Sequence, residues 1–224
     1  MTQERWTAVD QYINEMLVPS DPILEAAIRA SADAGLPSIQ VSPPQGKLLY
    51  LLARSINARS ILEIGTLGGY SSIWMARALA PGGHLLTLEA DSKHAEVARA
   101  NFARAGLSES IELRLGPALK TLPQVAGEGR GPFDLIFIDA NKSTMAEYFD
   151  WALKLSRRGS IIIADNVIRD GAVAEPANPD PDIQGVRRFN ERVAAERRVS
   201  ATAIQTVGSK GYDGFALVLV LDAA

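Results

Sequence analysis

Short runs of apolar residues recur along the chain at intervals of about 25 residues, with helical patterns between them. The runs occupy residues 60–64, 85–89, 111–115, 135–139 and 161–165. Continuous apolar runs of this length, alternating with helices, are typical of parallel strands that are covered on both faces. Helical patterns such as residues 70–79 and 93–105 provide the crossover connections. The pattern therefore predicts an α/β protein with a mostly parallel sheet.

Two further apolar runs, at residues 201–207 and 215–221, lie closer together than the others. Only the seven residues 208–214 separate them. A connection this short cannot hold a crossover helix, so the two strands must be antiparallel. We therefore expect a seven-stranded, mostly parallel sheet with an antiparallel last strand.

The segment before the first predicted strand contains three helical patterns. In the first, apolar residues recur on one helical face at Trp6, Val9, Ile13 and Met16 or Leu17. Such a stripe packs either on its own domain or on a partner. We expect residues 1–57 to form an N-terminal helical extension packed on a core of residues 58–224, in one compact domain.

The second predicted helix begins at Pro22, with Asp21 as its N-cap residue, and the third spans about residues 44–56. Residues 36–43 connect these two helices and are expected to reach the carboxyl edge of the sheet. Residues 167–184 are rich in Pro, Asp and Ala and are predicted to form a loop. Long loops of compact domains are often lids or substrate walls, so both connections are candidates to border a binding site.

The composition limits the classes of function. The 224 residues are 47% hydrophobic, and 23 Lys and Arg against 26 Asp and Glu give a net charge of −3. This balance disfavours a nucleic-acid partner and favours a small-molecule substrate. The absence of cysteine excludes disulfides, thiolate metal sites and cysteine nucleophiles. Neither a signal peptide nor an apolar stretch long enough for a membrane span is evident, so we expect a soluble, cytoplasmic protein.

A glycine-containing turn at residues 63–69 joins the first predicted strand to a helix. Gly65 lets the backbone approach a ligand closely, and free amides at the start of a helix favour an anion. Glu89 ends the second strand, 24 residues after Gly65, where it can accept the hydroxyls of a ribose. Ligands of open α/β sheets bind at this edge. The turn therefore predicts a nucleoside-binding site, with a ligand-free βα turn as the alternative.

Oxygen-bearing side chains end two strands at the same edge of the sheet. Asp139 ends the fourth strand, and Asp165 and Asn166 end the fifth. Two carboxylates and an amide carbonyl are hard donors that suit Mg²⁺. The alternative is that the two aspartates only cap helices or bind loop amides. Lys142, three residues after Asp139, favours a functional cluster and a metal site.

These residues together resemble the cation-dependent O-methyltransferases, the family of caffeoyl-CoA and catechol O-methyltransferases and their small bacterial relatives. The resemblance covers most of the chain from residue 41 onward. Its markers are ILEIGTLGGYSSIWMARAL (61–79), TLEAD (87–91), GPALKTL (116–122), FDLIFIDANK (133–142), IIIADNVI (161–168) and GYDGFALVL (211–219). It implies a Rossmann-like class I methyltransferase fold, a homodimer, and methyl transfer from S-adenosyl-L-methionine to a hydroxyl of a small, catechol-like aromatic acceptor. The implied metal is Mg²⁺, with Ca²⁺ or Mn²⁺ as alternatives.

The resemblance also implies roles for individual residues. Asp139, Asp165 and Asn166 match the metal ligands, and Lys142 and Asp139 match catalytic positions. The implied cofactor-binding residues are Val41, Glu63, Gly65, Tyr70, Ser71, Glu89, Ala118 and Asp139. Asn141 departs from the family, which often carries Asp there, and this leaves the charge around the metal site open.

Three other functions share some of these features. A nicotinamide-dependent oxidoreductase has the same fold plan, but its glycine fingerprint needs glycine where Leu67 stands. A methyltransferase of nucleic acids would carry a basic stripe, whereas the arginine pairs here are scattered. A non-catalytic binding module is the third. His84, expected in the turn before the second strand, and His94, on the following helix, are both expected at the surface and not as zinc ligands. The acceptor pocket is expected between residues 37–43, 169–181 and 208–214.

Overall fold

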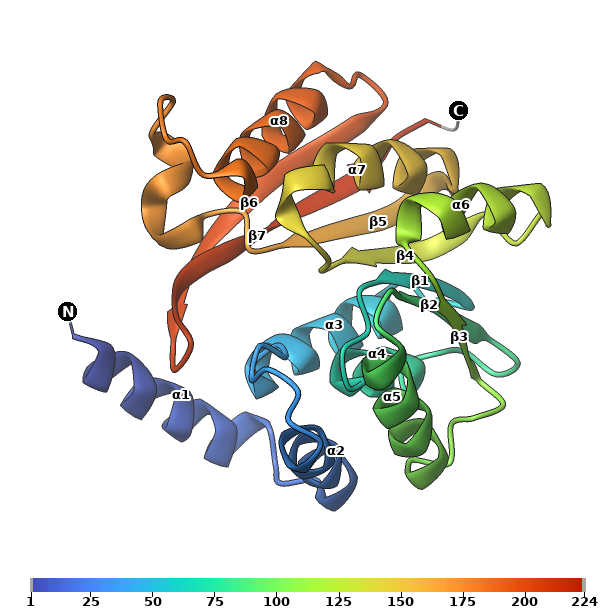
Figure 1. Ribbon diagram of the computed structural model, residues 1–224, viewed down its shortest axis with the longest axis vertical. Coiled ribbons are helices and arrows are strands. Elements are labelled where there is room, and N and C mark those ends of the chain that lie inside the picture. Colours follow the sequence, from blue (N-terminus) through green and yellow to red (C-terminus); the bar gives the residue numbers. More distant parts are fainter. Residues whose placement is uncertain (1, 223–224) are drawn as a thin grey trace.

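The computed structural model describes residues 2–222 and is built around one seven-stranded sheet (Figure 1). In chain order the elements are α1 (Gln3–Leu17), α2 (Pro22–Asp33), α3 (Pro43–Ser55), β1 (Ser60–Ile64), α4 (Tyr70–Ala76), β2 (His84–Glu89), α5 (Ser92–Arg104), β3 (Ile111–Leu115), α6 (Ala118–Gly127), β4 (Phe133–Ile138), η1 (Lys142–Thr144), α7 (Met145–Lys154), β5 (Ser156–Asp165), η2 (Arg169–Ala174), α8 (Pro181–Ala195), β6 (Val199–Gly208) and β7 (Gly211–Val220). Helices alternate with strands from β1 to β5, as the spacing of the apolar runs predicts.

The strand order is β3-β2-β1-β4-β5-β7-β6, and β7 is antiparallel to both of its neighbours. The first five strands are parallel to one another. Ile64 pairs with Leu88 of β2 and with Ile138 of β4, so these three strands end side by side. The chain changes direction across the sheet between β1 and β4, which is the position where open α/β sheets bind ligands. The predicted Rossmann-like fold with an antiparallel last strand is confirmed.

The last hairpin is longer than predicted. The pairing of β6 with β7 continues to Gly208 and Gly211, so the connection is the two-residue turn Ser209–Lys210, and the predicted seven-residue connection is wrong. Residues 211–214 lie outside the predicted strands, and two glycines and an aspartate among these four residues hid their strand character. They can pair because β6 is an edge strand whose side chains are mostly exposed, so the ladder there does not depend on apolar packing.

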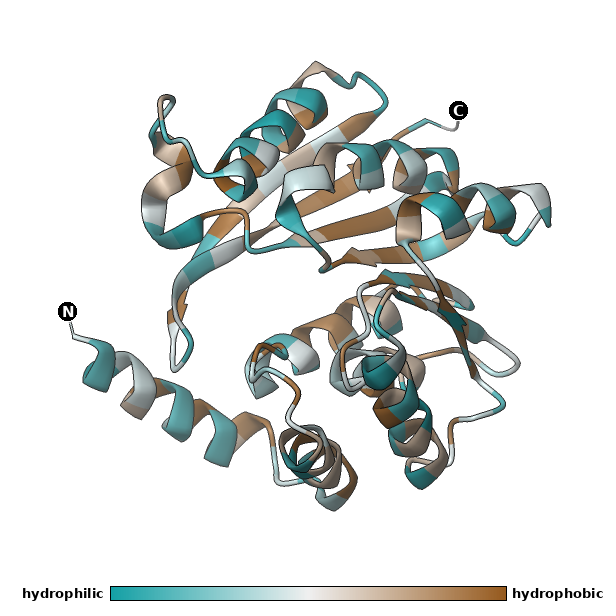
Figure 2. Ribbon diagram, in the orientation of Figure 1, coloured by the Kyte–Doolittle hydropathy of each residue, from teal (hydrophilic) through white to brown (hydrophobic). Residues whose placement is uncertain are grey.

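Helices cover both faces of the sheet. Leu62, Ile136 and Ile162 face one core cluster with α6, α7 and α8, whereas Ile61, Leu135 and Ile163 face a second cluster with α2, α3, α4 and α5. Figure 2 shows the resulting hydrophobic strands between helices whose outer faces are hydrophilic. Burial on both faces explains the continuous apolar runs and holds the carboxyl ends of the strands in fixed positions.

The N-terminal helices differ in how they are packed. Asp21 caps α2 as predicted, because its Oδ1 accepts a hydrogen bond from the Ile23 amide at 3.0 Å. In contrast, α1 has no fully buried residue among those described, and Met16 and Leu17 of its apolar stripe are 63% and 67% exposed. The division of the chain at residue 57 stays a prediction.

Residues 167–184 are not the uninterrupted loop that their composition predicts. They contain the 3₁₀ helix η2 and the start of α8. Pro181 is the first residue of α8, and the side chain of Asp180 caps it by accepting a hydrogen bond from the Asp182 amide at 2.8 Å. Proline in the first turn starts helices well, so this part of the loop prediction is wrong. No helix in the described residues has the length and apolar character needed to span a membrane.

Candidate functional site

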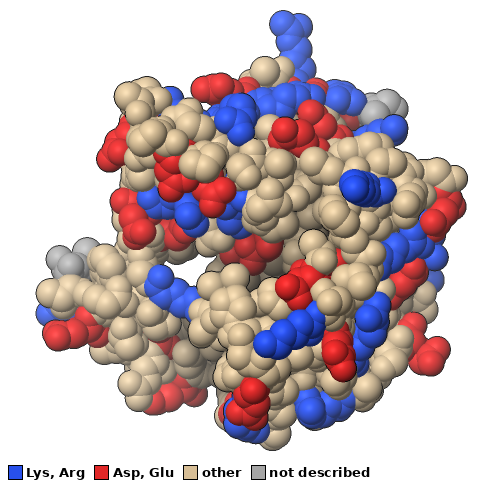
Figure 3. Space-filling model, in the orientation of Figure 1, with Lys and Arg blue, Asp and Glu red and all other residues tan. Residues whose placement is uncertain are grey.

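A cavity of about 1390 Å³ lies at the carboxyl end of the parallel strands. Figure 3 shows this face of the molecule hollowed, with acidic side chains recessed in it. A pocket for one drug-sized ligand usually measures about 300–1000 Å³, so this cavity has room for two ligands side by side. Ten of the predicted site residues line it: Val41, Gly65, Tyr70, Ser71, Glu89, Ala118, Asp139, Lys142, Asp165 and Asn166.

The turn between β1 and α4 is shaped by its glycines. A Cβ atom on Gly65 would lie 2.1 Å from the carbonyl oxygen of Asp139, and one on Gly68 would lie 2.0 Å from Oγ of Ser31. Gly65 also has φ of +101°, a conformation that favours glycine. These glycines therefore let the turn pack against the end of β4 and against α2. The two ends of the cavity, at Gly65 and at Asp139, are in direct backbone contact.

Glu63 is the one predicted site residue that does not line the cavity. It is fully buried beneath the turn, and its carboxyl group accepts hydrogen bonds from the hydroxyls of Ser71 (2.5 Å), Thr87 (2.7 Å) and Ser72. Burial raises the pKa of Glu63 to about 7, and the three hydroxyl hydrogen bonds oppose that rise. Glu63 therefore acts on the cavity through Ser71, which does line it.

Glu89 connects the glycine turn to the end of β2. One carboxylate oxygen accepts the amides of Thr66 and Leu67, at 3.1 and 2.8 Å, and the other accepts those of Ala90 and Asp91, both at 2.9 Å. The side chain is 9% exposed and borders the cavity. Glu89 thus borders the cavity with four backbone donors already holding its carboxylate, and its contact with a ribose stays a prediction.

The placement of the two histidines differs in detail from the prediction. His94 is partly exposed, as expected for a surface residue, and it also lines the cavity, with Nδ1 at 3.6 Å from Oε1 of Glu89. The turn of α5 that carries His94 faces the end of β2, which a helical pattern alone does not reveal. His84 is the first residue of β2 and not part of the preceding turn, and its Nε2 lies 3.3 Å from the Ser60 hydroxyl.

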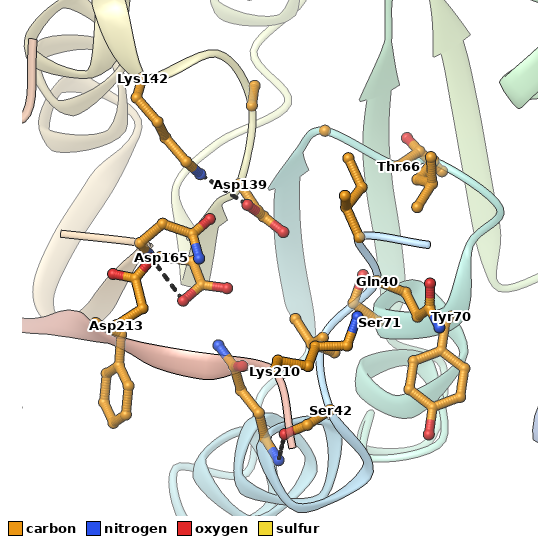
Figure 4. A pocket seen from close by; sticks show the side chains of 18 of the residues that line it. Gln40, Ser42, Thr66, Tyr70, Ser71, Asp139, Lys142, Asp165, Lys210 and Asp213 are labelled. Atoms are coloured by element: carbon orange, nitrogen blue, oxygen red, sulfur yellow. Dashed lines mark hydrogen bonds and ion pairs between the residues drawn. The ribbon is translucent and has the colours of Figure 1, made fainter. Parts of the chain in front are cut away.

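The predicted metal ligands lie at the opposite end of the cavity (Figure 4). Nζ of Lys142 donates to Oδ1 of Asp139 at 2.8 Å, and the lysine side chain is only 8% exposed. Asp165 is buried, and burial together with the nearby Asp139 carboxylate raises the pKa of Asp165 to about 7. Asn166 has φ of +58°, a left-handed conformation that asparagine tolerates better than most residues. The cluster thus concentrates two carboxylates around a single lysine.

The donor set of this end suits a hard divalent cation. No group of three or more His, Cys, Asp and Glu side chains with metal-site geometry occurs within residues 2–222. The predicted set has only two carboxylates, Asp139 and Asp165, and its third donor is the amide oxygen of Asn166. Such oxygen donors suit Mg²⁺ or Mn²⁺, which retain water or substrate oxygens. A cation would also offset the cost of burying the Asp165 carboxylate next to the charge of Asp139. The residues present therefore fit a divalent metal.

Asn141, which departs from the family pattern, is engaged outside this cluster. Its Nδ2 donates to Oγ1 of Thr144 at 2.6 Å, and its Oδ1 accepts a hydrogen bond from the hydroxyl of Tyr148. The side chain therefore holds η1 against α7. These contacts give Asn141 a structural role next to Lys142.

Several cavity residues were not singled out from the sequence. Lys210, in the β6–β7 turn, donates to the carbonyl oxygen of Ser38 at 3.1 Å. Oδ1 of Asp213 accepts the amides of Ile168 and Arg169, both at 3.0 Å, and thereby fixes the loop after β5. The sequence placed the hairpin at the pocket wall, but the direction of these side chains depends on contacts between distant segments.

Two of the three predicted pocket walls line the cavity broadly. They are the connector, through residues 38–42, and the β6–β7 hairpin. Of residues 169–181, only Arg169 lines the cavity, and the start of α8 contributes Asp182 instead. The rest of the loop turns away because η2 and the cap of α8 direct the chain along the surface.

Known proteins share both this sequence and this fold. The model of the O-methyltransferase family matches residues 14–220. A catechol O-methyltransferase of Niastella koreensis is 53% identical over 98% of this chain and 100% of its own length. An O-methyltransferase from Bacillus cereus, solved in complex with SAH, has 56% identity and a TM-score of 0.97 over 98% of this chain and 100% of its own.

A third similar protein is the O-methyltransferase TomG of Streptomyces achromogenes, involved in tomaymycin synthesis and solved in complex with SAM. It has 53% identity and a TM-score of 0.95 over 99% of both chains. These matches give no support to a nicotinamide-dependent oxidoreductase, and they confirm the predicted resemblance. With a family model that covers nearly the whole chain and relatives above 50% identity, the chain belongs to the O-methyltransferase family and is an enzyme of that class.

Proposed function

We propose that the protein transfers the methyl group of S-adenosyl-L-methionine to one hydroxyl of a small aromatic vicinal diol, with the help of a divalent cation. The observation that carries this proposal is the sharing of one cavity by the Gly65–Glu89 turn region and the Asp139–Asp165 cluster. Similar structures were solved with SAH (S-adenosylhomocysteine) or SAM, and a close relative is named a catechol O-methyltransferase. These names support both the cofactor and the acceptor class.

The cofactor end of the cavity provides the residues to hold S-adenosylmethionine. In this proposal Glu89 binds the ribose and Ala118 borders the adenine, whereas Tyr70, Ser71 and Gly65 surround the methionine part. All five residues line the cavity, which supports this assignment. Val41 closes this end from the connector. S-adenosylmethionine supplies a methyl group on a positively charged sulfur. Fixing that methyl group about 3–3.5 Å from the attacking oxygen removes translational freedom and can supply several kcal/mol.

The acceptor end provides the residues to hold a divalent cation, namely Asp139, Asp165 and Asn166. A free phenol with a pKa of about 10 is only about a thousandth ionised at neutral pH. A divalent cation bound there would lower the pKa of a coordinated phenol and help to orient the acceptor. Asp139 and Asp165 would hold that cation at the ends of β4 and β5, next to the cofactor end.

We assign to Lys142 the removal of the proton from the attacking hydroxyl group. Its side chain is almost fully buried, and its ammonium group is held 2.8 Å from Asp139. In its neutral form the amine accepts the proton of the attacking hydroxyl, and in its charged form it stabilises the phenolate. The sulfonium and the phenolate neutralise each other as the methyl group moves, so exclusion of water from the cavity favours transfer.

A transfer assay with labelled S-adenosylmethionine and catechol tests this function. We expect methylation of catechol in the presence of Mg²⁺, loss of methylation in EDTA, and recovery when Mg²⁺ is restored. Phenol, which has one hydroxyl and cannot chelate, serves as the matched acceptor and should remain unmodified. Full activity of the metal-stripped protein would overturn the metal-assisted mechanism while leaving the O-methyltransferase assignment in place.

The exposed face of α1 supports the predicted homodimer. Val9, Tyr12, Met16 and Leu17 are each more than half exposed on this helix. Contiguous apolar exposure of this kind is typical of protein interfaces. Light scattering should give twice the chain mass of 24.0 kDa, and Met16→Glu should shift the protein toward the monomer. A monomer for the unmodified protein at micromolar concentration would refute the dimer.

A further inference from the structure

Two cations at the acceptor end have no part in the proposed methyl transfer. The first is Arg169, which follows the predicted metal ligand Asn166 by three residues and lines the cavity. Its Nε is shielded from solvent and has no hydrogen-bond partner in the described part of the chain. Its guanidinium makes no ion pair with any of the described carboxylates. A buried donor without a partner is costly, so Arg169 is poised to receive an acceptor group.

The backbone at Arg169 keeps the side chain in this position. The residue has φ of +54°, a left-handed conformation that costs free energy for an arginine. Oδ1 of Asp213 stabilises it by accepting the Arg169 amide at 3.0 Å, in addition to the amides of Ile168 and Gly214. Asp213 is thereby committed to three backbone donors. The carboxylate of Asp213, on β7, therefore binds the backbone of Arg169 and forms no ion pair with its guanidinium group.

The second cation is Lys210, at the tip of the β6–β7 hairpin. Within residues 2–222 its ammonium group donates one hydrogen bond, to the Ser38 carbonyl, a neutral acceptor at 3.1 Å. Burial lowers the pKa of Lys210, while the charges of Asp139 and Asp165 oppose that shift, which places the ammonium near the acceptor end. Figure 4 shows Lys210 bordering the same space as Asp139 and Asp165. Lys210 forms no ion pair with either.

The hairpin tip that carries Lys210 is held by two side chains of α1. Oδ2 of Asp10 accepts the Ser209 amide at 2.7 Å, and Nε2 of Gln3 donates to the Gly208 carbonyl at 2.8 Å. Both partners lie on α1, which is otherwise only lightly packed. The tip is thus fixed over the cavity by specific contacts, and Lys210 reaches from it toward the connector.

The other described aspartates that line this end already have partners or roles. Asp10, Asp182 and Asp213 accept backbone amides, Asp139 pairs with Lys142, and Asp139 and Asp165 are the proposed ligands of a cation. Within residues 2–222, Arg169 and Lys210 therefore remain without an ion-pair partner beside the acceptor space. A carboxylate satisfies both, because a guanidinium binds it through two parallel hydrogen bonds and an ammonium adds a third.

We propose that Arg169 and Lys210 bind a carboxylate carried by the aromatic acceptor, so that the preferred substrate class is acidic vicinal diols. This inference rests on the proposed function, because it takes the diol to lie at Asp139 and Asp165. The diol is held at one end of the acceptor and the carboxylate at the other. The two cations then determine acceptor specificity and take no part in the methyl transfer itself.

The test compares 3,4-dihydroxybenzoate with 3,4-dihydroxybenzamide, which has the same diol and no charge. The variants are Arg169→Gln, Arg169→Lys and Lys210→Met, with Arg197→Gln and Lys154→Met as matched controls at exposed positions outside the cavity. We expect Arg169→Gln and Lys210→Met each to lower kcat/KM for the benzoate about 10- to 100-fold, because each variant loses a hydrogen bond to a charged group. The same variants should change kcat/KM for the benzamide less than about threefold, and the control variants should change neither. Arg169→Lys keeps the charge and should recover part of the loss.

Calorimetric binding of 3,4-dihydroxybenzoate to the SAH-loaded protein gives a second readout without turnover. We expect the two variants to weaken benzoate binding by a similar factor and to leave SAH binding unchanged. Equal losses for benzoate and benzamide would mean that the two residues only shape the loop and the hairpin, and would overturn the proposal. Equal use of both acceptors by the unmodified protein would also overturn it. If neither diol is methylated, the proposed function itself fails.

Discussion

The two ends of the cavity satisfy their buried charges in different ways. At the cofactor end, the protein itself provides the partners: Glu89 accepts four backbone amides, and Glu63 accepts three hydroxyls. At the acceptor end, Asp165 accepts the neighbouring Asn166 amide and a hydrogen bond from the side chain of Gln45, and the Arg169 side chain has no hydrogen-bond partner within the described chain. The buried charges of the cofactor end have their hydrogen-bond partners within the protein, whereas the acceptor end contains charges that a ligand would pair with.

The difference follows from how each end is assembled. Most of the cofactor end comes from neighbouring segments, since β1, the glycine turn and β2 all lie within residues 60–89, and Val41 and Ala118 are added from outside this range. The acceptor end brings together the connector, the ends of β4 and β5, and the β6–β7 hairpin. A site whose partners are nearby in sequence forms with the fold, which suits a cofactor common to many enzymes. A site built from distant loops can change its ligand without changing the sheet.

The largest expected effect is at the acceptor end. Asp165→Ala removes a proposed metal ligand, and we expect kcat to fall by about 1000-fold, equivalent to about 4 kcal/mol of transition-state stabilisation. The affinity for S-adenosylmethionine, measured by calorimetry, should change less than about threefold because the cofactor end keeps its own partners. The control Asp33→Ala replaces an exposed aspartate of α2 and should leave both quantities unchanged. Loss of cofactor binding along with turnover would indicate that Asp165 supports the whole fold and that the two ends are not separable.

The next effect concerns Glu63 and the pH dependence of folding. Its pKa rises from 4.5 to about 7 in the folded protein, so its contribution to stability is fully present below pH 4.5 and is lost as the pH rises through about 7. Between these limits the loss amounts to about 3 kcal/mol. Urea unfolding of the ligand-free protein from pH 4.5 to 8 should include this decrease, and Glu63→Gln should reduce the total decrease by this amount.

The comparison with Glu63→Gln isolates one carboxyl group. Asp165 also has a raised pKa and contributes in the same direction, but it is present in both proteins and cancels in the difference. Parallel pH profiles for the two proteins would show that Glu63 is already ionised in the folded state. The hydroxyls of Ser71, Ser72 and Thr87 would then be stabilising a buried carboxylate.

A smaller effect is expected for Glu89→Gln. The amide has one acceptor oxygen in place of two, so one pair of backbone amides loses its partner and the ribose loses a charged acceptor. We expect the Kd for S-adenosylmethionine to rise about 10-fold, or about 1.4 kcal/mol, with kcat at saturating cofactor nearly unchanged. A fall in kcat at saturation with an unaltered Kd would contradict the assignment of Glu89 to the cofactor end.

The smallest effect is expected for the hydrogen bond by which Asp10 of α1 holds the β6–β7 hairpin. Asp10→Ala removes an exposed hydrogen bond to the Ser209 amide and should lower the free energy of unfolding by less than about 1 kcal/mol. The KM for a carboxylate-bearing diol should rise about two- to threefold because Lys210 loses its fixed position. Glu4→Ala, also on α1, is the control. An equal rise in KM for the neutral diol would show that the hairpin does not act through recognition of the carboxylate.

The parts of the molecule that follow from local patterns could be predicted from the sequence. The order of strands and helices, the cap at Asp21 and the meeting of Asp139 with Asp165 depend on apolar runs and on the rule that parallel strands end at one edge. Lys142 lies close to Asp139 because only two residues separate them. The two-residue hairpin turn was missed because residues 212–214 lack an apolar pattern.

Other features depend on contacts that no local pattern contains. Glu63 was predicted to touch the cofactor, but the hydroxyls of Ser71, Ser72 and Thr87 enclose it, and this depends on how α4 and β2 pack. His94 faces Glu89 because of the rotation of α5 about its axis. Arg169 and Lys210 were not singled out because their directions depend on Asp213 and on α1, which lie far away in the sequence.

The central claim is that the acceptor end holds a divalent cation together with the diol. Calorimetric titration of Mn²⁺ into the SAH-loaded protein, with catechol or with phenol present, tests it most directly. We predict one saturable site that catechol tightens by at least about 10-fold, that phenol leaves unchanged, and that Asp165→Ala removes. Absence of a saturable site, or equal Mn²⁺ binding by Asp165→Ala, would contradict the account.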